Sequence, residues 1–179
     1  MRKYLALLLA AMVVPLAIAG YAIADSSRSE AAKAQSATAR YHDLQDALDD
    51  GYSILPAVAS TSTVVATGGC AASAQGLGAM GVHYLNAGLL DTTVDAQSPE
   101  VLVYEPQANG RMKLVALEYV AAGPPNPAPS LFGQVFSLTD LTPYGASGAN
   151  AWTLHAWIWA PNPSGVLMPW NPRVTCDNA

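Results

Sequence analysis

The first 24 residues carry the pattern that most constrains the fold, because they indicate which part of the chain folds and in which compartment. Arg2 and Lys3 precede an apolar run that ends at Ile18, and small residues then lead to Ala24. This order is typical of a secretory signal peptide, here 1–24. The alternative is a membrane anchor, but the uninterrupted apolar run is shorter than the roughly 20 residues that a spanning helix needs. We therefore expect 25–179 to form a single secreted or periplasmic globular domain.

The expected mature chain is acidic. Its 155 residues are enough for one domain with its own core. It holds six basic and thirteen acidic residues, a net charge of −7 with histidine neutral. An acidic surface repels phosphate backbones, and no cluster of basic residues suits anionic lipids. We expect neither nucleic acid nor, after signal cleavage, a membrane as a partner.

Cys70 and Cys176 are the only cysteines in the chain. Exported proteins in an oxidising compartment usually pair an even set of cysteines. We predict one disulfide between them, which would close a loop of about a hundred residues and stabilise the fold by about 3–5 kcal/mol in the chain-entropy model. The alternative, two thiols that bind a metal or form a redox pair, lacks the C-x-x-C spacing.

An amphipathic helix is predicted over residues 29–50. The segment has no Pro or Gly and is rich in Ala. Its apolar positions recur at helical spacing: Ala37, Tyr41, Leu44 and Leu48. Gly51 is a natural stop, and the opposite side of the helix, which includes His42, is interpreted as a solvated face.

Downstream of this helix the sequence favours strands. Two runs rich in β-branched and aromatic residues, 101–104 and 114–121, flank the turn Asn109-Gly110, which predicts an antiparallel hairpin. Further strands are predicted at 82–85 and 152–159, and the Pro-rich segment 123–129 is predicted to be an extended connector. The expected fold is α+β, with one N-terminal amphipathic helix packed on a mainly antiparallel sheet of about five strands.

Two motif-like segments do not support a familiar catalytic site. The G-x-G-x-x-G pattern at 76–81 precedes a predicted strand, whereas a dinucleotide site needs a helix there, so we interpret it as a glycine-rich turn. The segment 145–149 resembles G-x-S-x-G but has Ala at the last position. H-E-x-x-H and Walker patterns are absent from the sequence.

Three polar residues inside predicted strands suggest a metal site. His83 and His155 lie where an imidazole is unusual without a partner, and Glu118 shares a strand face with apolar residues, where a lone carboxylate is costly to bury. Two imidazoles and one carboxylate are a ligand set for zinc, copper or iron. His42 on the helix is a further candidate ligand. Alternatively, both histidines are hydrogen-bonded core residues, and Glu118 pairs with a nearby basic residue.

Aromatic residues beside these positions suggest a small-molecule pocket. We expect Tyr84, Tyr119, Trp157 and Trp159 to shape it. The preferred hypothesis is an extracytoplasmic protein that binds a transition metal or small ligand through the His/His/Glu cluster, with metalloenzyme activity as one form of that function. One alternative is a non-catalytic module that binds a glycan or apolar ligand through Trp157 and Trp159. The other is a structural envelope protein that binds nothing.

Several segments together resemble an uncharacterised family of small secreted bacterial proteins. They are Gly81-Val82-His83-Tyr84, Pro99 to Pro106 (PEVLVYEP), Leu117-Glu118-Tyr119, Leu154 to Trp159 (LHAWIW) and Asn162-Pro163-Ser164-Gly165. The resemblance covers most of the expected mature chain. It implies a secreted, bacterial, single-domain protein, and it implies no particular activity or catalytic residue.

Overall fold

A computed structural model describes residues 25–123 and 127–179. The predicted signal peptide, 1–24, and part of the predicted connector, 124–126, lie outside the described residues. Among the described residues, no helix has the length and apolar character needed to cross a membrane.

The predicted helix over 29–50 is present as three consecutive pieces. An α-helix covers 25–38, the 3₁₀ helix η1 covers Ala39–His42, and the short helix α2 covers Leu44–Asp49. The break falls at Asp43, whose backbone is extended and whose side chain accepts a hydrogen bond from the Gln45 amide. Asp43 therefore caps a new helix, which is a common role for aspartate, and the prediction of one uninterrupted helix was wrong.

The break also changes which residues face the core. Ala34, Thr38, Tyr41 and Ala47 are buried, whereas Leu48, predicted on the apolar face, is 40% exposed. Tyr41 is fixed at the break because its hydroxyl donates to Asp50 and its backbone oxygen accepts from the Tyr104 hydroxyl. Helical periodicity drawn through the break therefore places the last turn incorrectly.

The sheet is larger than predicted, with eight strands rather than about five. The strands are β1 (Ser53–Leu55), β2 (Val64–Thr67), β3 (Cys70–Ser73), β4 (Ala79–Leu85), β5 (Val101–Pro106), β6 (Met112–Ala121), β9 (Ser137–Asp140) and β10 (Asn150–Ala156). All pairings are antiparallel, in the order β2-β3-β4-β5-β6-β10-β9, and β1 also pairs with β4. A separate two-stranded ribbon joins β7 (Ser130–Leu131) to β8 (Gln134–Val135).

The predicted hairpin is confirmed as β5 and β6. Its turn is closed by Gln107 and Arg111, and Gly110 has a φ of 77°, which glycine adopts without strain. The glycine-rich segment 76–81 begins as a turn at 76–78, as interpreted from the sequence, and its last three residues already belong to β4. The strand predicted over 152–159 instead ends at Ala156, because the Trp157 backbone amide turns to bond the Val166 oxygen.

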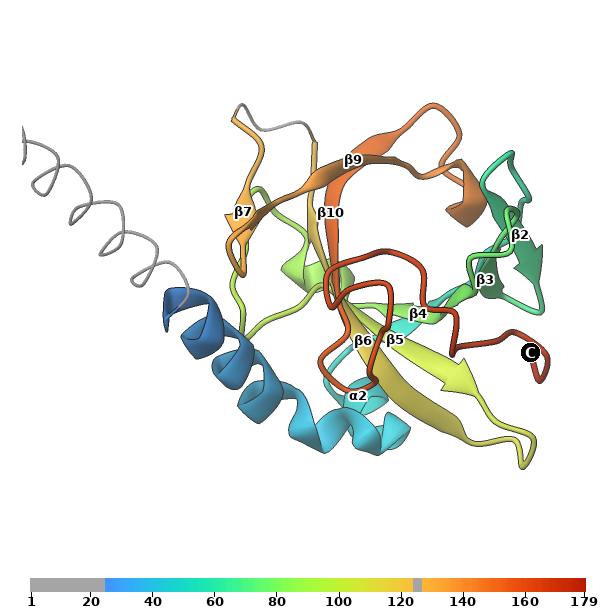
Figure 1. Cartoon of the computed structure of the whole chain (residues 1–179), viewed down its shortest axis with the longest axis horizontal. Helices are drawn as coiled ribbons and strands as arrows, with labels where there is room; N and C mark the ends of the chain where they lie inside the picture. The colour runs from blue at the N-terminus through green and yellow to red at the C-terminus, as the bar shows by residue number, and fades with distance from the viewer. Residues whose placement is uncertain (1–24, 124–126) are drawn as a thin grey trace, which may run out of the picture.

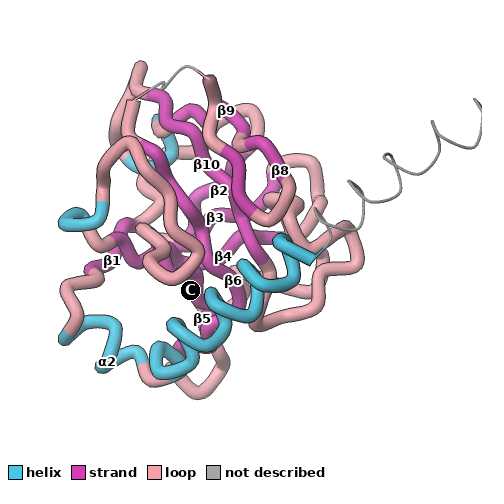
Figure 2. The backbone as a smooth tube through the Cα atoms, turned by 90° about the vertical axis from the view of Figure 1, so that its left-hand side faces the viewer, coloured by secondary structure: helices cyan, strands magenta, loops and turns pink. Residues whose placement is uncertain are grey.

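The sheet curls, so that β9 and β10 arch over toward β2 and β3 (Figure 1). The N-terminal helical segments cover the outer face of the sheet (Figure 2). The core on that face contains Ala34 and Tyr41 from the helical segments and Tyr84, Tyr104 and Leu117 from the strands. A short 3₁₀ helix, η3 (Thr142–Tyr144), links β9 to β10.

The curl is closed by the backbone of η3. The Pro143 oxygen accepts hydrogen bonds from Val58 and Ala59, which precede β2. The sheet therefore has an outer, helix-covered face and an inner face that is partly enclosed by its own ends.

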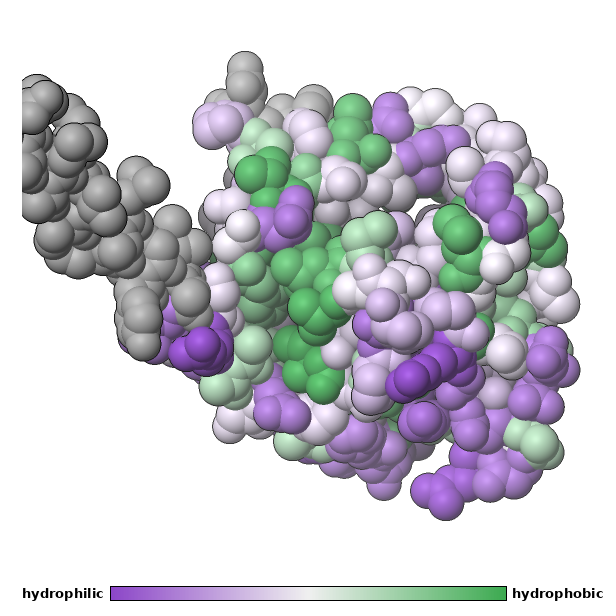
Figure 3. All heavy atoms as spheres, in the orientation of Figure 1, coloured by the Kyte–Doolittle hydropathy of each residue, from purple (hydrophilic) through white to green (hydrophobic). Residues whose placement is uncertain are grey.

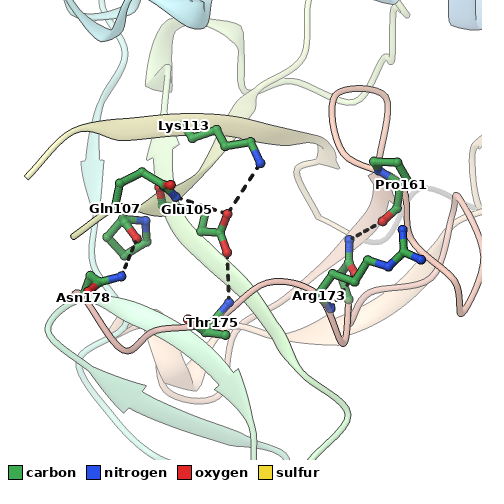
Figure 4. Close-up of polar contacts among 9 residues, drawn as sticks. Glu105, Gln107, Lys113, Pro161, Arg173, Thr175 and Asn178 are labelled. Carbon is green, nitrogen blue, oxygen red and sulfur yellow. Dashed lines mark hydrogen bonds and ion pairs between the residues drawn. The ribbon is translucent and has the colours of Figure 1, made fainter. Parts of the chain in front are cut away.

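The predicted disulfide is present. Cys70 at the start of β3 is bonded to Cys176, with their Cα atoms 5.7 Å apart. Polar contacts hold the same C-terminal segment against the β5–β6 hairpin (Figure 4): Glu105 accepts from the Thr175 amide and pairs with Lys113, and Asn178 donates to the Pro106 oxygen. The chain end is thus fixed to the sheet by one covalent bond and several hydrogen bonds.

Candidate metal centre

His83, Glu118 and His155 come together on the inner face of the curled sheet, as predicted. His155 on β10 lies directly opposite Glu118 on β6. His83 reaches them from β4, across the intervening strand β5. On β5, Val103 is paired with His83 and Val101 with Glu118. Both valines are buried in the core beside the three polar groups.

The nitrogen-to-oxygen distances within the cluster are longer than those of charge-assisted hydrogen bonds. His83 Nε2 lies 3.4 Å from Glu118 Oε2, and His155 Nδ1 lies 3.4 Å from Glu118 Oε1. A charge-assisted N–H···O bond is shorter, about 2.7–2.9 Å. One candidate ligand atom from each residue lies within 4.8 Å of the other two, so a small rotation of the side chains would bring all three onto one ion.

All three side chains are buried. Burial lowers the pKa of His83 and of His155 well below the ordinary imidazole value, and the neighbouring His155 lowers that of His83 further. Burial raises the pKa of Glu118 to about 8, although a hydrogen bond with Thr153 opposes the shift. The three groups are close enough to form ion pairs if they were charged. Burial, however, favours the neutral form of each of them. At neutral pH the cluster therefore holds neutral imidazoles, the form in which histidine binds a metal.

Neighbouring groups hold the three side chains in place. His83 forms a hydrogen bond with the Gly81 backbone. The Thr153 hydroxyl forms a hydrogen bond with Glu118. It also lies 2.7 Å from the Thr139 hydroxyl on β9, and this contact holds Thr153 in place. Such outer contacts orient the ligands in metal sites. Among the buried side-chain polar atoms of the described residues, His155 Nε2 has no hydrogen-bond partner. An unpaired buried polar atom is costly and is characteristic of a functional site.

Tyr144 completes the cluster and was not predicted. Its hydroxyl lies 3.3 Å from Nδ1 and 3.2 Å from Nε2 of His83, and the two rings meet edge to face with their centroids 5.0 Å apart. Burial raises its pKa well above the ordinary phenol value, and the charge of Glu118 raises it further. Tyr144 is on η3, so the turn that closes the curled sheet also places a neutral hydroxyl over the histidine.

A cavity of about 280 Å³ leads to the cluster. Glu118, His155 and Tyr144 line it. Its other walls are largely apolar and come from β2, β4, β9, η3 and the C-terminal segment: Val64, Met80, Leu138, Pro143, Pro169 and Trp170. The polar residues of these walls are Thr63, Thr139, Asp140 and Thr153. In the space-filling view an opening is visible inside the arch of the sheet (Figure 3). The cluster is thus buried but adjoins a space where a small molecule fits.

The two tyrosines predicted in the pocket lie on the other side of the sheet. Tyr84 packs edge to face against Tyr104 in the helix-facing core, and the Tyr119 hydroxyl donates to the Ala96 oxygen. Side chains alternate along a strand, so the neighbours of His83 and Glu118 must point away from them. This alternation, applied to both tyrosines, excludes them from the site.

The predicted tryptophans are separated. Trp157 is 3% exposed, stacks beside His155 with centroids 6.3 Å apart, and donates its indole hydrogen to the Met168 oxygen. Trp159 instead packs toward the N-terminal helical segments, where its indole donates to Thr38 and its ring meets His42. Trp157 therefore supports the cluster, and Trp159 does not border it.

His42, the further candidate ligand, is not brought to the cluster. It is exposed on η1, and its ring lies against Trp159 with centroids 4.4 Å apart. It lines a surface hollow with Arg111 and Met112. The helical face that includes His42 was interpreted as solvated, and its exposure agrees with that interpretation.

Comparison with known proteins adds no assignment: no family model matches the chain, and no curated protein or solved structure matches it. The site is therefore judged on its geometry alone.

Proposed function

We propose that the protein is exported and binds one divalent transition metal ion through His83, Glu118 and His155. Two buried imidazoles and a buried carboxylate form a ligand set that accepts zinc, copper and iron. The observation that carries the proposal is the convergence of three buried side chains, each of which places one candidate ligand atom within 4.8 Å of the other two. The 3.4 Å separations between the Glu118 oxygens and the histidine nitrogens are longer than charge-assisted hydrogen bonds, so such bonds do not account for the cluster.

The electrostatics of the metal-free cluster support the same function. Burial makes every charge costly here, so the protein holds a carboxylic acid and two neutral imidazoles rather than ion pairs. A divalent ion would pay for the ionisation of Glu118 and would release its proton on binding. A core without a ligand would be more stable with an apolar residue at this position.

Three protein ligands leave at least one position of a four-coordinate ion open. Such an ion lowers the pKa of a bound water and polarises an oxygen of a second ligand. Tyr144 and Thr153 are the neighbouring groups of this chain that can donate a hydrogen bond to what binds there. A hydrolytic or oxidative metalloenzyme is the catalytic form of this proposal.

Export is proposed on two features. The disulfide between Cys70 and Cys176 is typical of an oxidising compartment, and residues 1–24 have the order of a signal peptide. Both features suit a periplasmic or secreted protein, in keeping with the resemblance to small secreted bacterial proteins.

The alternative of a binding module built on the tryptophans has less support. Trp157 is buried, and its indole is already hydrogen-bonded. Trp159 packs toward the helical segments on the outer face of the sheet. The two rings therefore do not form one exposed platform of the kind on which a sugar stacks.

Elemental analysis of the mature protein, exported and purified without a histidine tag, tests the proposal. We expect about one metal ion per chain, and its loss in folded His83→Ala and His155→Ala variants. The control is His42→Ala, which removes an exposed histidine outside the cluster and should leave the metal content unchanged. Failure to bind metal, even after reconstitution with zinc, copper and iron, would refute the proposal, as would equal metal loss in the control.

A further inference from the structure

The cavity above the cluster has walls of two kinds. Toward the sheet it ends at Glu118, His155 and Tyr144, and elsewhere Met80, Leu138 and the other apolar residues described above form its sides. A site with one polar end and apolar sides selects molecules with one polar head and an apolar body.

The charge expected at the polar end specifies the head group. A divalent ion bound to one ionised carboxylate and two neutral imidazoles leaves one net positive charge in a buried place. Buried charge is costly unless it is paired, so a singly charged anionic oxygen is the ligand that makes the centre neutral. Asp140 at the cavity wall does not oppose this strongly, because it is exposed and already accepts two hydrogen bonds from Thr142.

The volume of the cavity limits the body of the ligand. About 280 Å³ is at the lower end of the range for small-molecule sites. At roughly 30 Å³ for each water molecule of the liquid, the space equals about nine waters. A molecule of about ten non-hydrogen atoms fills it, which excludes oligosaccharides and peptides from full entry.

The geometry points to a small monoanionic acid with an aromatic or compact aliphatic body as the ligand of this site. Its anionic oxygen would occupy the open metal position, and its body would lie between Leu138 and Trp170. Tyr144 and Thr153 are the hydrogen-bonding groups of the lining beside it. The inference rests on the proposed function, because the positive charge that selects an anion comes from the metal.

Calorimetric titration of the zinc-loaded mature protein with benzoate tests the inference. Benzamide is the matched neutral probe, since it has the same shape and number of non-hydrogen atoms. We expect benzoate to bind at least about tenfold more tightly than benzamide, and at least about tenfold more tightly to the zinc-loaded than to the metal-free protein, a difference of about 1.4 kcal/mol.

Substitutions at the cavity rim locate the binding. Leu138→Trp and Thr63→Trp place bulk on two sides of the rim and should weaken benzoate binding at least about tenfold. Val135→Trp on β8 is the control, because Val135 is similarly exposed and lies outside the cavity lining. Zinc affinity, measured for all three, should stay unchanged and reports that each variant is folded.

The outcomes separate this inference from the proposed function. If zinc does not bind, both are refuted. If zinc binds but benzoate and benzamide bind alike, only the inference is refuted. Equal effects of the rim variants and of Val135→Trp would also refute it, because benzoate would then bind elsewhere.

Discussion

Glu118→Gln should make the metal-free protein more stable at neutral pH while it weakens metal binding. Glu118 is buried, and burial raises its pKa from 4.5 to about 8. An acid whose folded pKa lies above its unfolded pKa contributes stability that is complete below the unfolded pKa. This contribution is lost as the pH rises toward the folded value. Between about pH 4.5 and pH 8 the metal-free protein should therefore lose the stability that Glu118 contributes, and the amide variant should lack this one contribution to the pH profile.

The size of the effect follows from the shift. At pH 7 the raised pKa of Glu118 corresponds to about 3 kcal/mol. Glutamine keeps an oxygen that can accept a hydrogen bond from Thr153, but its amide group suits the contacts of the carboxyl less well. We therefore expect a net gain of about 2 kcal/mol in the free energy of unfolding. For a domain of this size, that gain raises Tm by about 4–8 °C.

The assay is thermal and urea unfolding at pH 5 and pH 7 after treatment with a chelator. Glu105→Gln serves as the control, because Glu105 pairs with Lys113 and accepts from the Thr175 amide, so its loss should not stabilise the fold. If Glu118→Gln instead lowers stability at pH 7 by the 1–3 kcal/mol typical of a lost buried hydrogen bond, Glu118 is a structural residue and the reasoning is wrong.

Three further predictions concern the fold. Reduction of the Cys70–Cys176 disulfide, or a double substitution to serine, should lower the free energy of unfolding by about 2–5 kcal/mol in urea titrations, and an unchanged midpoint would contradict this. Burial raises the pKa of Glu100 to about 7, so Glu100→Gln should remove a loss of about 3 kcal/mol that this carboxyl contributes between pH 4.5 and pH 7, seen in the difference between the pH profiles of Tm of the variant and the unsubstituted protein. Gly78→Ala should cost more than 2 kcal/mol by urea unfolding, because its Cβ would clash with the C-terminal backbone, whereas Gly76→Ala, with open space around it, should cost about 1 kcal/mol.

Local rules predicted the β5–β6 hairpin and the Cys70–Cys176 disulfide. Asn109-Gly110 specifies a tight turn, and two cysteines in an exported chain have one possible partner each. The cluster was also predictable, because His83, Glu118 and His155 each lie inside a strand pattern where a polar side chain is unfavourable without partners. The hairpin depends only on nearby sequence. The disulfide and the cluster depend on side chains that have few possible partners.

Features that depend on distant contacts were not predictable. The helix breaks at Asp43 because Tyr41 is anchored to Asp50 and Tyr104, and neither contact follows from helical periodicity. Tyr144 reaches the cluster through a turn between β9 and β10 that carries no strand or helix pattern. Its only sequence signal is Asp140, which caps that turn through Thr142.

The position of Trp170 was not predictable either, because it also depends on contacts with residues far away in the sequence. Trp170 lines the cavity and packs near Val64 and Met80, and no sequence pattern around it indicates that role. A β-bulge in the β5–β6 pairing places Val115 and Ala116 in one cluster and leaves Leu114 in the helix-facing core, although strict alternation along the strand would put Leu114 on the face of Glu118. Strict alternation fails at a bulge, which the sequence does not mark.

The most direct test of the central claim is the anomalous diffraction of crystals of the zinc-loaded mature protein, recorded at the zinc absorption edge. The account predicts one strong peak on the inner face of the sheet, about 2.0–2.2 Å from a nitrogen of His83, a nitrogen of His155 and an oxygen of Glu118. A peak at the exposed His42 with none between these three side chains would contradict it.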